Sequence, residues 1–199
     1  HGVTGSGKTE IYLRAIDHVV RKGQQAIFLV PEISLTPQTL ERVNAWFSGR
    51  VALLHSRLTS RQQFDQWWDI LEGRYDVVVG PRSALFAPLD NLGLIVIDEE
   101  HEWTYKQVET HPLYHARTAA MELSRLTRAT VVMGSATPDV ETYYQATRGR
   151  HRLLELPRRV SRAGSNRVAR LTPGLASVEV CDMRVELREG NREIFSRKL

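Results

Sequence analysis

Apolar residues recur along the chain with two different periods, which predict alternating strands and helices. Wholly apolar runs such as AIFLV at 26–30 and LGLIVID at 92–98 are typical of strands buried on both faces of a parallel sheet. Ile11, Ala15 and Val19 instead recur at the spacing of one helix face, which predicts a helix over 8–22. We therefore expect an α/β fold with a mostly parallel sheet and helices on both faces.

The same alternation continues to about residue 150. Further strands are predicted at 51–54, 75–80 and 130–135, and a further helix at 115–127. Helices are also predicted to begin at Thr36-Pro37 and Thr137-Pro138, because Thr is a good N-cap and Pro a good first residue. The first of these would bury Leu40, Val43 and Phe47.

Thr59 and Gln62 have the spacing of a capping box, which predicts a helix beginning after Thr59. Its apolar residues fall on one side of the helix: Phe64, Trp67, Trp68 and Leu71.

The composition changes after about residue 150. Gly, Ser, Pro and Arg dominate 157–177, which is typical of a linker. Beyond it, VEVCDM at 178–183 predicts a strand, and a short polar helix is predicted near 191–199. We expect one domain over 1–156, a linker over 157–177 and the start of a second unit over 178–199.

The net charge of +4 is too small to indicate a polyanionic partner, but its distribution is uneven. Residues 148–170 contain eight arginines and one acid, Glu155. Such a block is a candidate surface for phosphate groups, although an exposed, arginine-rich linker would have the same composition.

Cys181 is the only cysteine, which excludes an intrachain disulfide and a cysteine-based zinc cluster. No apolar run approaches the roughly 20 residues of a membrane span, and no signal peptide precedes the first motif. We expect a soluble, intracellular protein with no membrane partner.

The segment HGVTGSGKTE fits the pattern G-x-x-x-x-G-K-S/T of a phosphate-binding loop from Gly2 to Thr9. Lys8 would reach the β and γ phosphates, and the Thr9 hydroxyl would ligate Mg²⁺. The residues expected to contact the nucleotide are Gly2, Val3, Thr4, Gly5, Ser6, Gly7, Lys8, Thr9 and Glu10. A strand normally precedes such a loop, so without it we expect a loose or distorted loop.

Asp98, Glu99, Glu100 and His101 directly follow the most apolar predicted strand. Ligands bind at the carboxyl ends of strands in open α/β sheets. In an enzyme with a phosphate-binding loop, this position supplies the acid that holds Mg²⁺, here Asp98. Glu99 is then the expected general base for the attacking water. Histidines such as His101 are more often structural.

Gly134-Ser135-Ala136-Thr137 again follows an apolar strand. The segment is typical of a helix cap, and the hydroxyls of Ser135 and Thr137 could also hydrogen-bond to the acidic cluster.

In this order and spacing, the three segments resemble motifs I, II and III of superfamily 2 helicases. Within that superfamily the chain resembles the PriA family of primosomal replication-restart helicases. The segments that carry this resemblance are GVTGSGKTE, LVPEISLTPQ (29–38), VVVGPRSALFAP (77–88), IDEEH (97–101), the aromatic-rich loop EWTYKQVETHPLYHAR (102–117) and GSATPDVE (134–141). One departure is Pro81, where the family pattern has threonine.

The resemblance implies a RecA-like P-loop NTPase lobe of an ATP-dependent 3′–5′ DNA helicase that acts in replication restart and primosome assembly. It implies ATP and Mg²⁺ as cofactors, with zinc only in a part of the parent protein outside this sequence. The implied partners are forked or single-stranded DNA, primosome proteins and single-stranded DNA-binding protein, in the bacterial cytoplasm. Residues 1–156 would form the first motor lobe without its first strand, and 178–199 the start of a truncated second lobe.

The resemblance also implies residues that contact DNA or couple it to ATP hydrolysis. Arg82 and Ser83 belong to the region of motif Ib, and Arg82 is expected to face a DNA phosphate. In the aromatic-rich loop, Trp103, Tyr105 and Tyr114 offer stacking faces, while Lys106, His115 and Arg117 offer charge. Alternatively, these aromatic side chains only pack the loop onto the domain.

Three other interpretations stay open: another superfamily 2 translocase (RecG-like or restriction-type), a non-catalytic module that binds DNA or a partner, and a small-molecule P-loop kinase. The resemblance places the arginine finger of the motor outside this sequence. Because losing such a finger costs roughly 10³–10⁵ in rate, we expect these 199 residues alone to hydrolyse ATP negligibly.

Overall fold

A central parallel sheet is built from the apolar runs of the sequence. The computed structural model describes residues 1–34, 37–47, 49–161, 170–172 and 179–198, and its main sheet has the strand order β2-β3-β1-β4-β5. The strands are β1 (Gln25–Leu29), β2 (Val51–Leu53), β3 (Val77–Gly80), β4 (Leu92–Asp98) and β5 (Thr130–Gly134). All four pairings in this sheet are parallel, as predicted, so the strand carboxyl ends share one edge.

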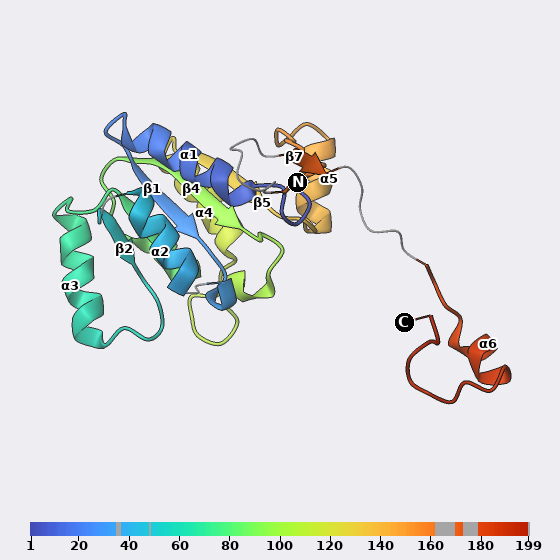
Figure 1. Ribbon diagram of the computed structural model, residues 1–199. Helices are drawn as coiled ribbons and strands as arrows, with labels where there is room; N and C mark the ends of the chain where they lie inside the picture. Colours follow the sequence, from blue (N-terminus) through green and yellow to red (C-terminus); the bar gives the residue numbers. More distant parts are fainter. Residues whose placement is uncertain (35–36, 48, 162–169, 173–178, 199) are drawn as a thin grey trace.

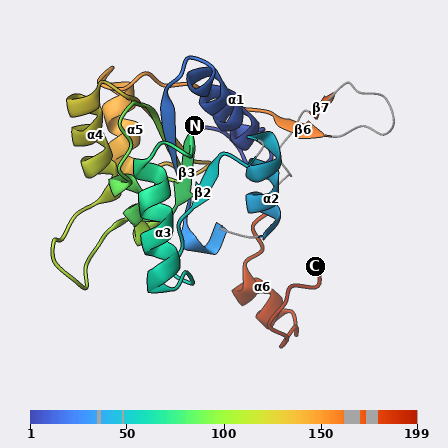
Figure 2. The ribbon, with the colours of Figure 1, turned by 90° about the vertical axis from the view of Figure 1, so that its left-hand side faces the viewer.

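Helices cover both faces of this sheet (Figures 1 and 2). The flanking helices are α1 (Lys8–Val20), α2 (Pro37–Trp46), α3 (Ser60–Leu71) and α4 (Ala116–Thr127). Phe28 packs in the cluster that contains Leu13 and Ile16 of α1, whereas its neighbour Ile27 packs in the opposite cluster with Ala120 of α4. Burying a large apolar side chain stabilises the fold by about 1.5–3 kcal/mol, so each strand contributes to both layers.

Short 3₁₀ turns follow three of the strands. They are η1 (Glu32–Ser34), η2 (Arg82–Phe86) and η3 (Trp103–Tyr105). All three lie beyond the carboxyl ends of β1, β3 and β4, on the edge where the candidate site is found.

The helix starts agree only in part with the caps that the sequence predicts. Thr59 and Gln62 form the predicted capping box of α3. Helix α5 (Val140–Thr147) is capped by Asp139 and not by Thr137, because the Asp139 carboxylate accepts from the first free backbone N–H groups of the helix. Helix α2 begins at Pro37, and its predicted cap Thr36 lies outside the described residues.

The apolar side predicted for α3 is not the side that faces the core. Ile70 is the buried residue of this helix, while Phe64 and Trp68 are 61% and 47% exposed and pack against each other edge to face. Helical spacing predicted that these side chains lie on one side of the helix, but the opposite side of the helix packs against the sheet.

The first residues of the chain are held just beyond the end of β5. The Gly2 N–H donates to the carbonyl of Ser135, and Gly2 forms a parallel bridge with Leu156. Gly2 therefore contacts both the end of β5 and Leu156, which are far from Gly2 in the sequence.

The predicted linker 157–177 contains regular structure, which the sequence analysis did not predict. Strands β6 (Arg159–Ser161) and β7 (Arg170–Thr172) pair in antiparallel register. The Val160 N–H donates to the carbonyl of Gly5, so the first strand of this hairpin lies against the glycine loop.

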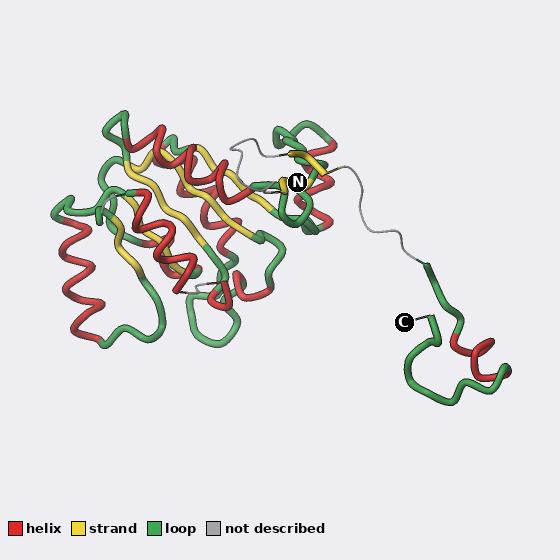
Figure 3. The backbone as a smooth tube through the Cα atoms, in the orientation of Figure 1, coloured by secondary structure: helices red, strands yellow, loops and turns green. Residues whose placement is uncertain are grey.

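Both predictions for the last twenty residues were wrong. No strand is formed over 179–182, and helix α6 (Met183–Arg188) follows directly, capped by Asp182 (Figure 3). Residues 191–198 form bends and turns in place of the predicted helix. Among the described residues no strand pairs with 179–182, whereas Asp182 supplies a local cap. No helix in the described part of the chain is long and apolar enough to cross a membrane.

Candidate nucleotide and nucleic-acid site

The glycine loop leads directly into α1. Gly5 and Gly7 have φ angles of 77° and 89°, a region that suits glycine, and Gly7 is the N-cap of the helix. Since Gly7 has no side chain to cap the helix, the first N–H groups of α1 point to the space that a phosphate would occupy.

The loop is tied to its surroundings, in contrast to the loose loop that we expected. Ser6 N–H donates to the carbonyl of Val3, and the contacts of Gly2 with Ser135 and of Val160 with Gly5 hold its two sides. The Lys8 ammonium donates to the carbonyl of Gly2 at 2.9 Å, so the lysine folds back across the loop.

The acidic residues predicted for catalysis lie beside this lysine. Asp98 ends β4, and the Lys8 ammonium is 3.8 Å from the nearer Glu99 carboxylate oxygen. The Glu99 N–H donates to the Asp98 carboxylate, and Glu99 has a φ of 45°, which costs a residue other than glycine about 1–3 kcal/mol. The structure thus brings together Lys8, Asp98 and Glu99, residues far apart in sequence.

The chemistry of these carboxylates fits a hard divalent cation. Burial, and next the neighbouring Glu99 carboxylate, raise the pKa of Asp98 above its ordinary value. A cation bound there would relieve both effects. Within the described residues, no group of three or more His, Cys, Asp and Glu side chains could hold a metal. Mg²⁺ needs no such group, because it usually combines one or two carboxylates with phosphates and waters.

Ser135 and His101 connect the acidic cluster to the end of β5. Ser135 is buried, and its hydroxyl lies 2.7 Å from His101 Nδ1 and 3.5 Å from a Glu99 carboxylate oxygen. The Thr137 hydroxyl lies 3.4 Å from the other ring nitrogen of His101. The predicted contact between the two hydroxyl residues and the acidic cluster is therefore present, and His101 mediates most of it.

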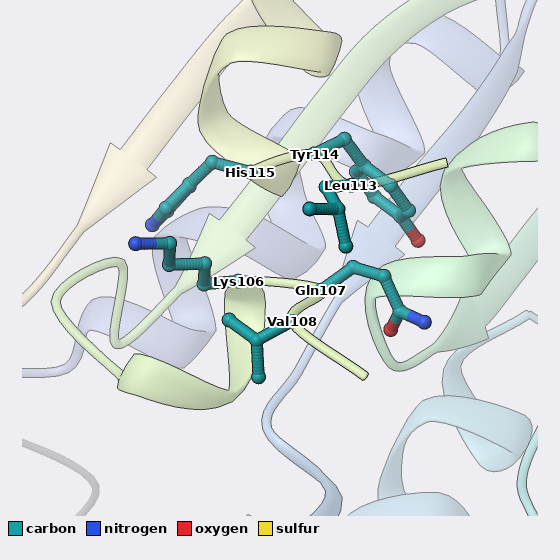
Figure 4. Close-up of a pocket in the computed structure, with 6 residues that line it drawn as sticks. All are labelled: Lys106, Gln107, Val108, Leu113, Tyr114 and His115. Atoms are coloured by element: carbon teal, nitrogen blue, oxygen red, sulfur yellow. The ribbon is translucent and has the colours of Figure 1, made fainter. Parts of the chain in front are cut away.

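The aromatic-rich loop folds back on itself and frames a hollow. Lys106 and His115 form an antiparallel bridge, and the Gln107 N–H donates to the carbonyl of Tyr114. The hollow has a volume of about 450 Å³ (Figure 4). It is lined by Lys106, Gln107, Val108, Leu113, Tyr114 and His115.

The aromatic residues of this loop have different environments. Trp103 is 76% exposed, so its ring is accessible, and its stacking on a base stays a prediction. Tyr105 is only 1% exposed, and its hydroxyl donates to the Asp98 carbonyl at 2.7 Å. The prediction of a stacking face was therefore wrong for Tyr105, which packs the loop under the acidic cluster. Tyr114 lies edge to face against Phe86.

Arg82 links the loop to η2. Its guanidinium donates to the Gln107 side chain at 2.9 Å and to the Thr104 carbonyl at 2.7 Å. Arg82 and the exposed Ser83 also line a second hollow, of about 260 Å³, next to the aromatic-rich loop. The predicted contact of Arg82 with a DNA phosphate stays a prediction.

His115 and Arg117 are partly buried and bond within the protein. The Arg117 guanidinium is 19% exposed and pairs with Glu100 at 2.7 Å, so the prediction that its charge serves DNA was wrong for this structure. The His115 ring caps α4 by accepting from the Arg117 N–H, and burial lowers its pKa. Lys106 lines the hollow, and its predicted contact with DNA stays a prediction.

Glu100, Asp139 and Thr142 are site residues that the sequence analysis did not assign. Glu100 is 2% exposed and contacts both of the others. The sequence shows that Glu100 lies between Glu99 and His101, but a local sequence pattern does not show which of two adjacent glutamates points into the protein.

The arginine block predicted to contact phosphate is only partly described. Among the described residues of the block, the exposed arginines are Arg148, Arg150, Arg152, Arg158 and Arg159. The Arg148 guanidinium lies over the ring of Tyr144. Arg162 and Arg167, and the side chain of Arg170, lie outside the described residues. A phosphate-binding role for this block stays a prediction.

Together, the parallel sheet, the glycine loop and the acidic cluster at its carboxyl edge define a P-loop NTPase lobe of the helicase type. The model of the DEAD/DEAH box helicase family matches residues 1–146, so the chain belongs to that family. The chain is also similar to the replication restart protein PriA of Bacillus subtilis, with 49% identity over 100% of this chain and 23% of that protein.

Other relatives agree. PriA of Thermotoga maritima is 38% identical over 96% of this chain and 24% of its own length. Among solved structures, RecG bound to a three-way DNA junction is similar with a TM-score of 0.56 and 26% identity, over 94% of this chain and 23% of that one. The helicase domain of Pyrococcus furiosus Hef, at a TM-score of 0.52 and 18% identity, shares the fold. The chain spans about a quarter of the length of the PriA proteins it matches.

Proposed function

We propose that this chain is the ATP-binding motor lobe of an ATP-dependent 3′–5′ DNA helicase that acts in replication restart and primosome assembly at stalled forks. The observation that carries the proposal is the position of Lys8, at the start of α1, within 3.8 Å of Glu99, which directly follows β4. A lysine that binds phosphate and a carboxylate that orients water must be close together for hydrolysis. The similarity to PriA proteins supports the replication-restart role.

The roles of the site residues follow from their chemistry. Backbone N–H groups of the segment from Gly2 to Glu10 would surround the phosphates, except those of Gly2, Val3 and Ser6, which donate to protein carbonyls. Lys8 would offset the negative charge of the phosphates. Thr9 and Asp98 would hold Mg²⁺, which when bound neutralises charge on the β and γ phosphate oxygens. Glu99 would accept a proton from, and orient, the attacking water.

DNA would lie along the edge formed by η2 and the aromatic-rich loop. Trp103 offers an exposed stacking face, and Lys106 and Tyr114 line the adjoining hollow, with Arg82 and Ser83 beside it. Ser135 and Thr137 would pass changes at the nucleotide to the rest of the lobe. The proposed macromolecular partners are forked or single-stranded DNA, primosome proteins and single-stranded DNA-binding protein, in the bacterial cytoplasm.

We assign residues 1–156 to the first motor lobe, 157–177 to a connecting segment and 178–199 to the start of the second lobe. The hairpin β6–β7 lies within the connecting segment.

Replacing Glu99 with Gln in the full-length protein tests the proposal. The variant should lose DNA-dependent ATP hydrolysis by about 10²-fold or more, because proton transfer by a positioned base contributes about 10²–10⁴. It should still bind a fluorescent ATP analogue, since Lys8 and the glycine loop are unchanged. Glu122→Gln, an exposed change on α4, is the matched control and should retain full turnover. Hydrolysis by Glu99→Gln at the control rate would reject the assignment.

A RecG-like translocase is the second candidate, supported by the similarity to the RecG structure. Deleting 106–115 from the full-length protein separates the two. A PriA-type motor should keep basal hydrolysis and lose its stimulation by DNA, whereas hydrolysis that DNA stimulates as before would favour the second candidate.

A further inference from the structure

A buried ionic cluster joins three segments of the chain beside the acidic residues of the site. Glu100 follows the two acidic residues at the end of β4, Arg117 lies in the first turn of α4, and Asp139 and Thr142 lie at the start of α5. Glu100 is 2% exposed and Arg117 is 19% exposed, so both charges are largely shielded from water.

Both oxygens of the Glu100 carboxylate have partners. One accepts from the Asp139 N–H at 2.8 Å, and the other accepts from Arg117 at 2.7 Å and from the Thr142 hydroxyl at 3.1 Å. The Arg117 guanidinium also donates to the Thr142 hydroxyl at 2.7 Å and lies 3.1 Å from the Asp139 carboxylate. A buried carboxylate is retained only where charge and hydrogen bonds compensate its lost hydration, and each of these contacts contributes to that.

The cluster holds the backbone next to it. Glu100 N–H donates to the carbonyl of Gly134, and the preceding residue, Glu99, has the unfavourable φ of 45°. Such a conformation persists only where its surroundings enforce it. Glu99 and Glu100 are consecutive, but their carboxylates have different partners. The Glu99 carboxylate approaches Lys8, while the Glu100 carboxylate lies in the ionic cluster.

We infer that Glu100, Arg117 and Thr142 are positioning residues for ATP hydrolysis, which hold Glu99 in its working orientation and attach α5 and the end of the aromatic-rich loop to it. This inference rests on the proposed function. The three side chains bond to one another beside the proposed nucleotide site, and their effect passes through the backbone of Glu99. Arg117 is the last residue of the aromatic-rich loop, so a movement of the loop would reach Glu99 through this ion pair.

Thr142→Val in the full-length protein tests the inference with little change in volume. It removes the hydroxyl that bonds to both Glu100 and Arg117. We expect kcat for DNA-stimulated hydrolysis to fall about 5- to 30-fold, which is about 1–2 kcal/mol and lies in the upper part of the range by which residues remote from a ligand modulate coupling. KM for ATP should change less than about 2-fold, because the lost hydroxyl affects the rate of the hydrolysis step and not the affinity for ATP.

Two companion variants separate positioning from folding. Thr142→Ser keeps the hydroxyl and should restore most of kcat. Thr147→Val, on the same helix, removes an exposed hydroxyl that bonds only to the Tyr144 carbonyl, and should match the unaltered protein. In the nucleotide-free protein, amide hydrogen exchange at 99–100 and 139–142 should be at least about 5-fold faster in Thr142→Val than in Thr147→Val.

A double-mutant cycle measures the ion pair itself. Glu100→Gln and Arg117→Gln should each lower kcat strongly, and the double variant should lose little more than either, because contacting residues are not additive. Thr142→Val with unchanged kcat and only a lower melting temperature would show a merely structural cluster and overturn the inference. Unaltered protein without DNA-dependent hydrolysis would instead reject the proposed function, and with it this role.

Discussion

Gly134 ends β5 at a place where no side chain fits. A Cβ added there would lie 2.7 Å from the Tyr12 ring carbon Cζ and nearer still to the Tyr12 hydroxyl. Tyr12 is 4% exposed and packs edge to face against Phe28, so its ring cannot swing into solvent. We predict that Gly134→Ala destabilises the protein by overpacking.

The geometry sets the size of this effect. Overpacking a dense core costs about 1–3 kcal/mol, and an overlap with both ring and hydroxyl belongs near the upper value. For a chain of this size 1 kcal/mol shifts the melting temperature by about 2–4 °C, so a loss of about 3 kcal/mol corresponds to about 6–12 °C. Because Gly134 pairs with Asp98 and its carbonyl accepts from Glu100, the same change should displace the acidic cluster.

The loss of stability can be measured by thermal unfolding of four proteins: the unaltered protein, Gly134→Ala, Tyr12→Phe and the double variant. Tyr12→Phe removes the closest clashing atom, so the double variant should recover about half of the lost stability, while Tyr12→Phe alone should cost less than about 1 kcal/mol. A melting temperature of Gly134→Ala within about 2 °C of the unaltered protein would refute the reasoning. So would a double variant no more stable than Gly134→Ala.

Two further predictions concern DNA affinity and acid stability. Trp103→Ala should weaken single-stranded DNA binding by about 1–3 kcal/mol and leave the melting temperature unchanged, because this ring is 76% exposed; fluorescence anisotropy with a labelled oligonucleotide and a thermal melt check both parts. The Arg117 guanidinium holds the pKa of Asp139 below its ordinary value of 3.8, so this carboxylate stabilises the fold above about pH 4, and the contribution is lost as the pH falls through the lowered pKa. Asp139→Asn keeps an N-cap side chain and removes the charge, so its urea midpoint should lie below that of the unaltered protein at pH 6, and the gap should close in acid, below the ordinary pKa of 3.8. Equal midpoints at pH 6, or a gap that persists in acid, would contradict this.

Much of the main lobe could be predicted because its signals are local. Wholly apolar runs predict strands buried on both faces, and β1, β3, β4 and β5 lie at or within two residues of the predicted ranges. The glycine loop could be placed because only glycine tolerates its φ angles, and the acids could be placed because parallel strands end on one edge. The DEAD/DEAH box helicase family match over 1–146 covers these same segments.

The predictions made from the sequence were wrong where the environment of a residue depends on a partner far away in the sequence. Tyr105 and Trp103 are both aromatic members of one loop, yet one is buried against the Asp98 carbonyl and the other is exposed. The helix face of α3 and the hairpin β6–β7 are further examples, because spacing predicts which side chains share a side and not which side the sheet covers.

Asp98, Glu99 and Glu100 show most clearly what the sequence determines and what the tertiary structure determines. The sequence by itself determined the chemistry, since the helicase motifs, the glycine loop and the acidic run depend on residue types at short spacing. Only the tertiary structure decided that Glu99 approaches Lys8 while Glu100 turns inward to Arg117. Adjacent carboxylates are equivalent in a sequence pattern, and they become different when packing gives one a buried cation and leaves the other at the site.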